Sequence, residues 1–126
     1  MQITRETSAS HLIRAIEPGR IRIGERWLSG SLIVTAEEII GDWTPAEPGR
    51  ITIDDLAPAL AGRPELIVVG AGSAPCVPDI DLMADLASRA VGLEFMQTPA
   101  ACRTFNVLVH EGRRVAAALI VEPISA

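Results

Sequence analysis

Lysine and tyrosine are both absent from the 126 residues, so all 11 basic residues are arginine. The lack of lysine excludes a Schiff-base lysine and the lysine of a phosphate-binding P-loop. Histidine occurs only at His11 and His110, and two residues so far apart form no spaced cluster of metal ligands. We therefore expect no metal site.

Long apolar runs and a cysteine framework are also missing. No apolar run approaches the roughly 20 residues that span a membrane, and the first residues, MQITRETSASHL, lack the apolar core of a secretory signal. Two cysteines do not make a disulfide scaffold. The formal net charge of -5 disfavours nonspecific binding to nucleic acid. We expect a cytoplasmic protein with reduced thiols, no transmembrane segment and one domain over residues 1–126.

Residues 92–121 (GLEFMQTPAACRTFNVLVHEGRRVAAALIV) carry the clearest structural pattern. After an apolar strand, Thr98 offers an N-cap hydroxyl and Pro99 suits the first helical position. Gly112 can adopt the left-handed conformation that ends a helix. The apolar run 115–121 is typical of a central strand covered on both faces. We predict strand, helix and strand. The expected inner face of the helix comprises Ala101, Phe105, Leu108 and Val109.

The preceding residues extend the same alternation. Residues 66–70 predict a buried strand, and Asp79 is placed to cap a helix that runs to about Arg89. Connections of this length join parallel strands. Residues 66–121 are thus predicted to contribute a parallel part of a sheet. The expected inner face of the helix after Asp79 comprises Ile80, Met83, Leu86 and Ala87.

The N-terminal half has the pattern of antiparallel strands. Segments 11–17, 20–23 and 27–35 predict a meander, with a Pro18-Gly19 turn and a bulge at Gly30. A short strand is expected at 39–40. Residues 52–55 resemble a helix-start box, so a brief helix through residue 61 is expected. The predicted fold is α/β: a three-layer domain with a mixed, partly parallel sheet flanked by helices, plus an N-terminal antiparallel β-meander.

Part of this sequence resembles a known family. The matching pattern consists of Thr98, residues 101–106 (ACRTFN), Leu108, Glu111, Arg113 and residues 115–119 (VAAAL), with LIVVGAG at 66–72. It is similar to a small family of uncharacterised bacterial and archaeal proteins that includes a mitochondrial complex I assembly factor. Ala71 departs from the threonine of many members. The resemblance implies a mixed sheet flanked by helices and a role in assembly, but no catalytic mechanism.

The carboxyl edge of the parallel strands is where a ligand would bind in this class of fold. The loop 70–78 and the turn at Thr98 are predicted to meet there. Gly70 and Gly72 allow close approach to the backbone, the helix N-terminus favours an anion, and Arg103 offers a charged fork. These features indicate a pocket for a small anionic group. The alternative is that the glycines only form a tight turn and Arg103 pairs with a carboxylate.

Two cysteines and one serine are the candidates for chemistry near this edge. Cys102 lies one turn into the helix, where the N-terminus and an arginine would lower the pKa of its thiol, and Cys76 could complete a redox pair. The alternative for Cys102 is that it packs as a small buried hydrophobe, which we favour. Ser73 lacks a GxSxG motif, and His110 is expected at the far end of the helix. We therefore assign no catalytic residue. The loop also lacks the third glycine of a dinucleotide fingerprint, and we expect no cofactor.

The remaining polar residues of the matching pattern favour structural roles. Asn106 is expected to hydrogen-bond a neighbouring loop, and Glu111 and Arg113 are expected to form an ion pair across Gly112. We expect a non-enzymatic protein that binds a protein partner and is similar to an assembly factor. The alternative is a protein that binds a small anion at the carboxyl edge, with or without thiol chemistry at Cys102.

Overall fold

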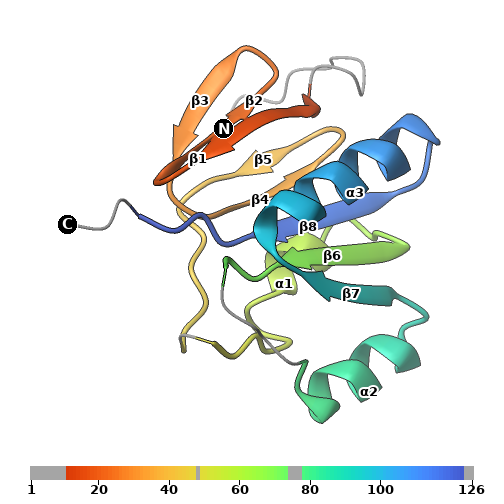
Figure 1. The fold of residues 1–126 in the computed structure, drawn as a ribbon. Coiled ribbons are helices and arrows are strands. Elements are labelled where there is room, and N and C mark those ends of the chain that lie inside the picture. The colour runs from red at the N-terminus through yellow and green to blue at the C-terminus, as the bar shows by residue number, and fades with distance from the viewer. Residues whose placement is uncertain (1–10, 48, 74–77, 124–126) are drawn as a thin grey trace.

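A mixed five-stranded sheet forms the centre of the part that the computed structural model describes, residues 11–47, 49–73 and 78–123 (Figure 1). The strand order is β5-β4-β8-β6-β7. β6 pairs in parallel with β7 and β8, whereas β4 runs antiparallel to β8 and β5. The predicted mixed, partly parallel sheet is confirmed. The bounds are β4 Leu32–Thr35, β5 Ile39–Ile40, β6 Leu66–Gly70, β7 Gly92–Met96 and β8 Val115–Leu119.

A second, antiparallel sheet contains β1 (Ile13–Glu17), β2 (Arg20–Ile23) and β3 (Arg26–Ser29) in that order. Gly19, with φ 82°, provides the left-handed residue of the β1–β2 turn. The single strand expected over residues 27–35 is wrong, because the chain leaves this sheet after β3 and enters the five-stranded sheet as β4. Gly30, with φ 81°, lies at the change of direction instead of in a bulge.

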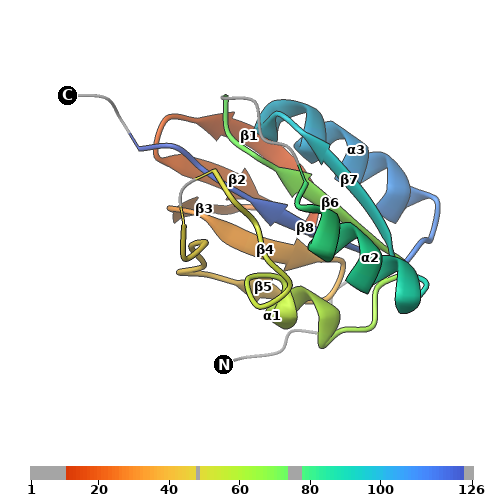
Figure 2. The ribbon, with the colours of Figure 1, turned by 90° about the horizontal axis from the view of Figure 1, so that it is seen from below.

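Helices cover both faces of the five-stranded sheet (Figure 2). α3 (Thr98–His110) and the three-stranded sheet bury their apolar residues on one face. α1 (Ala57–Leu60) and α2 (Ile80–Ser88) lie on the opposite face. The predicted layers and the N-terminal meander are therefore confirmed. In the expected helix-start box at residues 52–55, Thr52 and Asp55 do form reciprocal hydrogen bonds between side chain and backbone. The helix nevertheless begins only at Ala57.

α3 packs through the face that its periodicity predicts. Phe105 is fully buried, and the other three predicted positions are buried with it. The helix ends as expected, since Gly112 has φ 80° and its N–H donates to the carbonyl of Val109 at 2.9 Å. The strand–helix–strand prediction for residues 92–121 is confirmed.

α2 is capped as predicted but buries a different face. The Asp79 side chain accepts a hydrogen bond from the N–H of Asp81, which satisfies one free donor of the first turn. Leu82 and Leu86 are buried, whereas Ile80 is 78% exposed and Met83 is 52% exposed. The inner face expected from periodicity was wrong except at Leu86.

β8 is the central strand, and every residue in it is buried. Ala117 belongs to the core under α3, whereas Ala116 and Ala118 belong to the core on the α1 and α2 side. Three consecutive methyl side chains leave room for both helical layers to approach the sheet closely.

Candidate functional site

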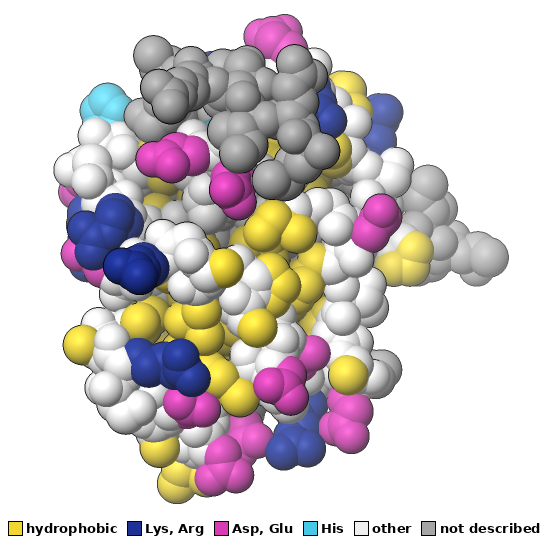
Figure 3. All heavy atoms as spheres, turned by 180° about the vertical axis from the view of Figure 1, so that it is seen from behind, with side chains coloured by type: hydrophobic (Ala, Val, Ile, Leu, Met, Phe, Trp, Pro, Cys, Tyr) yellow, Lys and Arg dark blue, Asp and Glu magenta, His cyan; other side chains and the backbone are white. Residues whose placement is uncertain are grey.

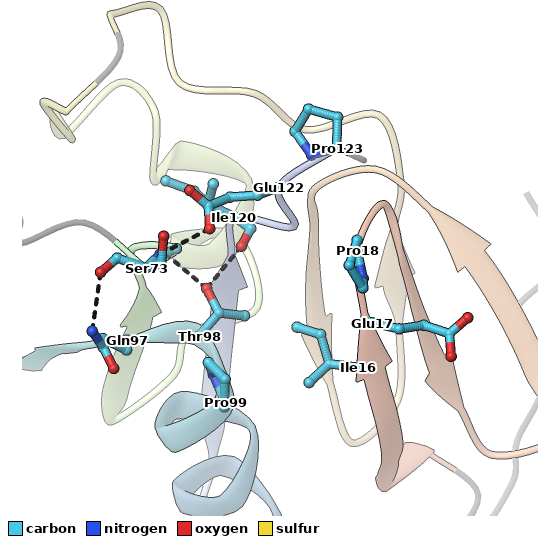
Figure 4. Close-up of a pocket in the computed structure, with 11 residues that line it drawn as sticks. Ile16, Glu17, Pro18, Ser73, Gln97, Thr98, Pro99, Ile120, Glu122 and Pro123 are labelled. Carbon is cyan, nitrogen blue, oxygen red and sulfur yellow. Dashed lines mark hydrogen bonds between the residues drawn. The ribbon is translucent and has the colours of Figure 1, made fainter. Parts of the chain in front are cut away.

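The carboxyl ends of the parallel strands border a cavity of about 800 Å³ (Figure 4). The β1–β2 turn lies opposite the loops that follow β6 and β7, so the cavity lies between the two sheets. A backbone hydrogen bond of 2.6 Å from the N–H of Gly19 to the carbonyl of Glu122 joins the two sides. The lining comprises Ile16, Glu17, Pro18, Gly72, Ser73, Gln97, Thr98, Pro99, Ile120, Glu122 and Pro123.

Thr98 connects three loops at the base of this cavity and does not cap its helix. The N-cap is Gln97, with no side-chain cap, so the predicted role of the Thr98 hydroxyl is wrong. This hydroxyl accepts from the N–H of Gly72 at 2.8 Å and donates to the carbonyl of Ile120 at 2.7 Å. It ties the ends of β6 and β8 to the start of α3, and the side chain is buried.

Glu122 occupies the position that the sequence suggested for an anion. Its carboxylate accepts a hydrogen bond of 3.0 Å from the N–H of Ser73. Gly72 has φ 82°, and a Cβ there would approach the Glu122 carboxyl carbon to 3.1 Å. Gly70 is equally restricted, because a Cβ would come to 3.0 Å from the Cα of Thr98. The glycines thus make room for the protein's own side chains and backbone.

The charges around the cavity disfavour an external anion. Among the described residues, the lining contains two carboxylates, Glu17 and Glu122, and no arginine. Glu17 pairs with Arg20 at the protein surface. A further polar group is also engaged, since the Gln97 amide donates to the Ser73 carbonyl at 3.0 Å. The visible polar groups of this edge therefore bind mainly to one another (Figure 4).

Cys102 lies on the inner side of α3, away from the lining. It is 5% exposed, and burial raises the pKa of its thiol to about 11, although the charge of Arg103 acts in the opposite direction. The thiol is thus protonated near neutral pH, which agrees with packing and not with a nucleophile. Arg103 is exposed and also lies off the lining, and no ion pair engages it among the described residues. Cys76 lies outside the described residues.

The other residues of the matching pattern stabilise the fold. The Asn106 amide makes two hydrogen bonds of 2.8 Å with the backbone of Ile13, so its partner is a strand and not a loop. Arg113 pairs with Glu65 at 3.6 Å, and the expected Glu111–Arg113 pair is wrong. Glu111 is the C-cap residue of α3.

Sequence reasoning missed Glu122 and Gln97, which complete the polar network of the edge. One signal was available for Glu122: it follows the predicted central strand, so its side chain had to lie near the carboxyl edge. Its partners are Gly72 and Ser73, about 50 positions earlier. This contact could be found only once the arrangement of the strands was known.

Residues 11–47, 49–73 and 78–123 contain neither a candidate metal site nor a membrane-spanning helix. No group of three histidine, cysteine or acidic side chains could hold a metal ion there. No helix in the same residues is long and apolar enough to cross a membrane.

The face of the molecule on the α1 side has hydrophobic side chains near its middle, with acidic and basic side chains around them (Figure 3). The large apolar residues nearby, including Ile40, Ile53 and Leu60, are half-buried against the core. Among the described residues, the large hydrophobic side chains with the greatest exposure are Trp27, Ile80, Met83 and Val107.

The fold and the edge define a mixed α/β protein in which a buried threonine and a surface glutamate bind backbone groups at the carboxyl edge of the parallel strands. Residues 13–120 match the family described as protein of unknown function (DUF498/DUF598), and the chain belongs to that family. The resemblance inferred from residues 66–119 is thereby confirmed.

Three relatives are similar to this chain. An uncharacterised protein of Rhodobacter capsulatus is 38% identical over 84% of this chain and 81% of its own length. The NADH dehydrogenase [ubiquinone] 1 alpha subcomplex assembly factor 3 of Danio rerio is 30% identical over 94% of this chain and 69% of its own length. A 13 kDa major membrane protein of Francisella tularensis is 34% identical over 48% of this chain. The match spans half of the Francisella protein and 35% of the human assembly factor 3.

Solved structures share the fold. A crystal structure of a Bordetella parapertussis protein has a TM-score of 0.81 and 31% identity, and the match covers 90% of this chain and 98% of that one. The protein MT938 has a TM-score of 0.67 at 20% identity, over 90% of this chain and 99% of that one, which shows the fold alone.

Proposed function

We propose that this chain is a non-catalytic, cytoplasmic protein that acts as a single domain and assists the assembly of respiratory complex I. One observation carries the proposal: the similarity to the zebrafish assembly factor 3 extends over 121 residues, nearly the whole chain. The shared region therefore includes most of the described strands and helices.

The geometry supports a binding protein more than an enzyme. At the carboxyl edge, the Thr98 hydroxyl and the Glu122 carboxylate bind backbone groups of the chain itself. A catalytic site usually holds nucleophiles and bases with shifted pKa values in a cleft. Here the buried thiol is held protonated, and Ser73 is engaged through its backbone groups.

Gene deletion in the native host tests this proposal. We expect a lower amount of assembled complex I on a native gel, and a lower NADH:ubiquinone reductase activity, while succinate:ubiquinone reductase activity stays unchanged as the control. Reintroduction of the wild-type gene should restore both quantities. An unchanged amount of complex I in the deletion strain would contradict the proposal.

A small ligand at the carboxyl edge is the second candidate, and the cavity of about 800 Å³ is the observation in its favour. Its two carboxylates favour a neutral or cationic ligand over the anion that the sequence suggested. Melting curves with inorganic phosphate test the anion directly: we expect no shift for the wild type. A phosphate-dependent rise in Tm that persists at constant ionic strength would restore the anionic alternative.

A further inference from the structure

The outer edge of β7 is an open strand edge. In the described part of the chain, β7 is the last strand of its sheet and pairs only with β6. On the β6 side, the N–H of Gly92 donates to Glu65 at 2.9 Å, and the carbonyl of Met96 accepts from Ala71 at 2.9 Å. The N–H and C=O of successive strand residues point to opposite edges. The N–H and C=O groups of Leu93 and Phe95 therefore point outward, away from β6.

The flank of α3 beside this edge carries Thr104. The Thr104 hydroxyl contacts the Met96 sulfur at 3.3 Å, so this flank of α3 faces β7. Val107, three residues later, is 57% exposed and points away from the core on the outer face of α3. Asn106 lies on the opposite flank, where it binds β1.

Exposed apolar side chains are also present on α2, the helix that contacts β7 from the other face. At 3.6 residues per turn, the apolar side chains of α2 cover a continuous arc of about 200°. Only Leu82 and Leu86 are buried in this helix. The exposed part of the arc consists of Ile80, Met83, Ala84 and Ala87.

Glu94 determines what can pair with β7. It is the middle residue of the strand, is exposed, and is the only charged residue in Gly92–Met96. Leu93 and Phe95 pack on the α2 side and Met96 packs on the α3 side, so alternation places Glu94 on the α3 side. An added strand would place one residue directly opposite this carboxylate.

We propose that the open edge of β7, between α2 and α3, binds an extended segment of a partner protein that has a basic residue opposite Glu94. This inference rests on the proposed assembly function and names the chemistry of the partner. The added strand would pair with Leu93 and Phe95 through its backbone. Its side chains would alternate between the α2 side and the α3 side, and the basic residue opposite Glu94 would lie on the α3 side.

Charge complementarity favours this occupant over a second copy of the chain. Antiparallel self-pairing that uses all four outward backbone groups is centred on Glu94 and places the two Glu94 carboxylates directly opposite each other. Like charges at opposite positions destabilise a strand pair. A single charge at the centre of an edge strand is also a known defence against self-association.

Titration of isotope-labelled protein with two synthetic heptapeptides tests the proposal. Both peptides alternate valine and threonine and differ only at the central residue, which is arginine or glutamate. We expect chemical-shift changes at the amides of Leu93 and Phe95, the two residues of β7 whose backbone groups point outward. The glutamate peptide should bind about two- to fivefold more weakly, and about 0.5 M salt should reduce the difference. Equal affinities, or shifts elsewhere on the protein, would overturn the proposal.

Two variants act as matched controls. Glu94→Lys reverses the charge at an exposed position and should reverse the peptide preference without loss of stability. Trp27→Ser removes an exposed hydrophobic on the three-stranded sheet and should leave both affinities unchanged. Sedimentation of the free wild type should show a monomer. A dimer that Glu94→Lys disrupts or strengthens would assign the edge to a second copy and overturn the proposal.

Complementation of the deletion strain separates this inference from the proposed function. If wild type restores complex I and Glu94→Lys does not, while Trp27→Ser does, the edge serves the assembly function. If wild type and Glu94→Lys restore it equally, the edge proposal fails and the assembly function stands. If wild type itself has no effect on complex I, the proposed function fails, and peptide binding still decides on the edge.

Discussion

The Asn106 side chain binds both backbone groups of Ile13, with its oxygen accepting from the N–H and its amide nitrogen donating to the carbonyl, each at 2.8 Å. These are the two hydrogen bonds that a neighbouring strand would make. Ile13 lies at the irregularity of β1, where the pairing with β2 shifts between Ile13 and Ala15. A helical side chain thus completes the pairing of an edge strand and attaches the three-stranded sheet to α3.

Asn106→Ala should therefore lower the free energy of unfolding by about 2–3 kcal/mol, because two backbone groups lose their partners. Asn106→Asp keeps the acceptor and loses the donor, so it should cost a comparable amount once the carboxylate is ionised and faces the Ile13 carbonyl. Denaturant melts of both variants measure these values. A loss of less than about 0.5 kcal/mol for Asn106→Ala would show that water replaces the amide without cost.

Thr98 gives a second test, since its hydroxyl bridges Gly72 and Ile120. Thr98→Val keeps the shape and removes both hydrogen bonds, and it should destabilise the protein by about 1–3 kcal/mol. Thr98→Ser keeps the hydroxyl and should cost less than Thr98→Val. If serine costs more than valine in the same denaturant series, packing of the methyl group and not the bridge is the main contribution.

The face of α3 is tested by a pair of substitutions. Phe105 is fully buried, and Phe105→Ala should cost about 3–5 kcal/mol through lost burial and the cavity that remains. Val107→Ala, two positions away on the exposed face, should stay within about 0.5 kcal/mol of wild type. Comparable losses for both variants in urea denaturation would contradict the observed orientation of the helix.

The buried Cys102 thiol should make the free energy of unfolding depend on pH in the alkaline range. Burial raises the pKa of its thiol to about 11 in the folded protein, from an ordinary value near 9.0. Between these values the unfolded chain releases the proton first, so the contribution to stability is complete below about pH 9 and is lost as the pH rises toward 11. From about pH 8 to about pH 10.5, wild type should lose up to about 2 kcal/mol more than Cys102→Ala, measured by denaturation.

Thiol labelling gives an independent measurement for the same residue. Because Cys102 is 5% exposed and protonated near neutral pH, it should react with a thiol reagent only on unfolding. A Cys76→Ser background isolates its signal. Reaction of the native protein at the rate of the denatured protein would contradict this expectation.

The sequence predicted those helices and strands that depend on residues close together along the chain. The strand, helix and strand of residues 92–121 follow from periodicity, Pro99 and Gly112, and Asp79 caps α2 as expected. α2 itself shows the limit of periodicity. Its apolar arc is wide enough for two different faces, and only the packing against the sheet selects Leu82 and Leu86.

Interactions distant in sequence account for the remaining errors. The Thr98 hydroxyl was expected to bind a backbone group of the next turn, but its partners are 26 and 22 positions away. Asn106 and Ile13 are 93 positions apart. The carboxyl edge was located correctly from the strand order, yet nothing local indicated that Glu122 would occupy the position expected for an anion.

The three alanines of β8 determine where this protein can vary as it evolves. Ala116, Ala117 and Ala118 are fully buried between the two helical layers, so a larger side chain at any of them would push a layer away from the sheet. Accommodating such a change would require simultaneous shortening of side chains on the facing helix. Substitutions are therefore tolerated most easily on the outer faces of the helices and at the strand edges. The buried centre keeps the positions of the sheet and helices constant while these outer surfaces change.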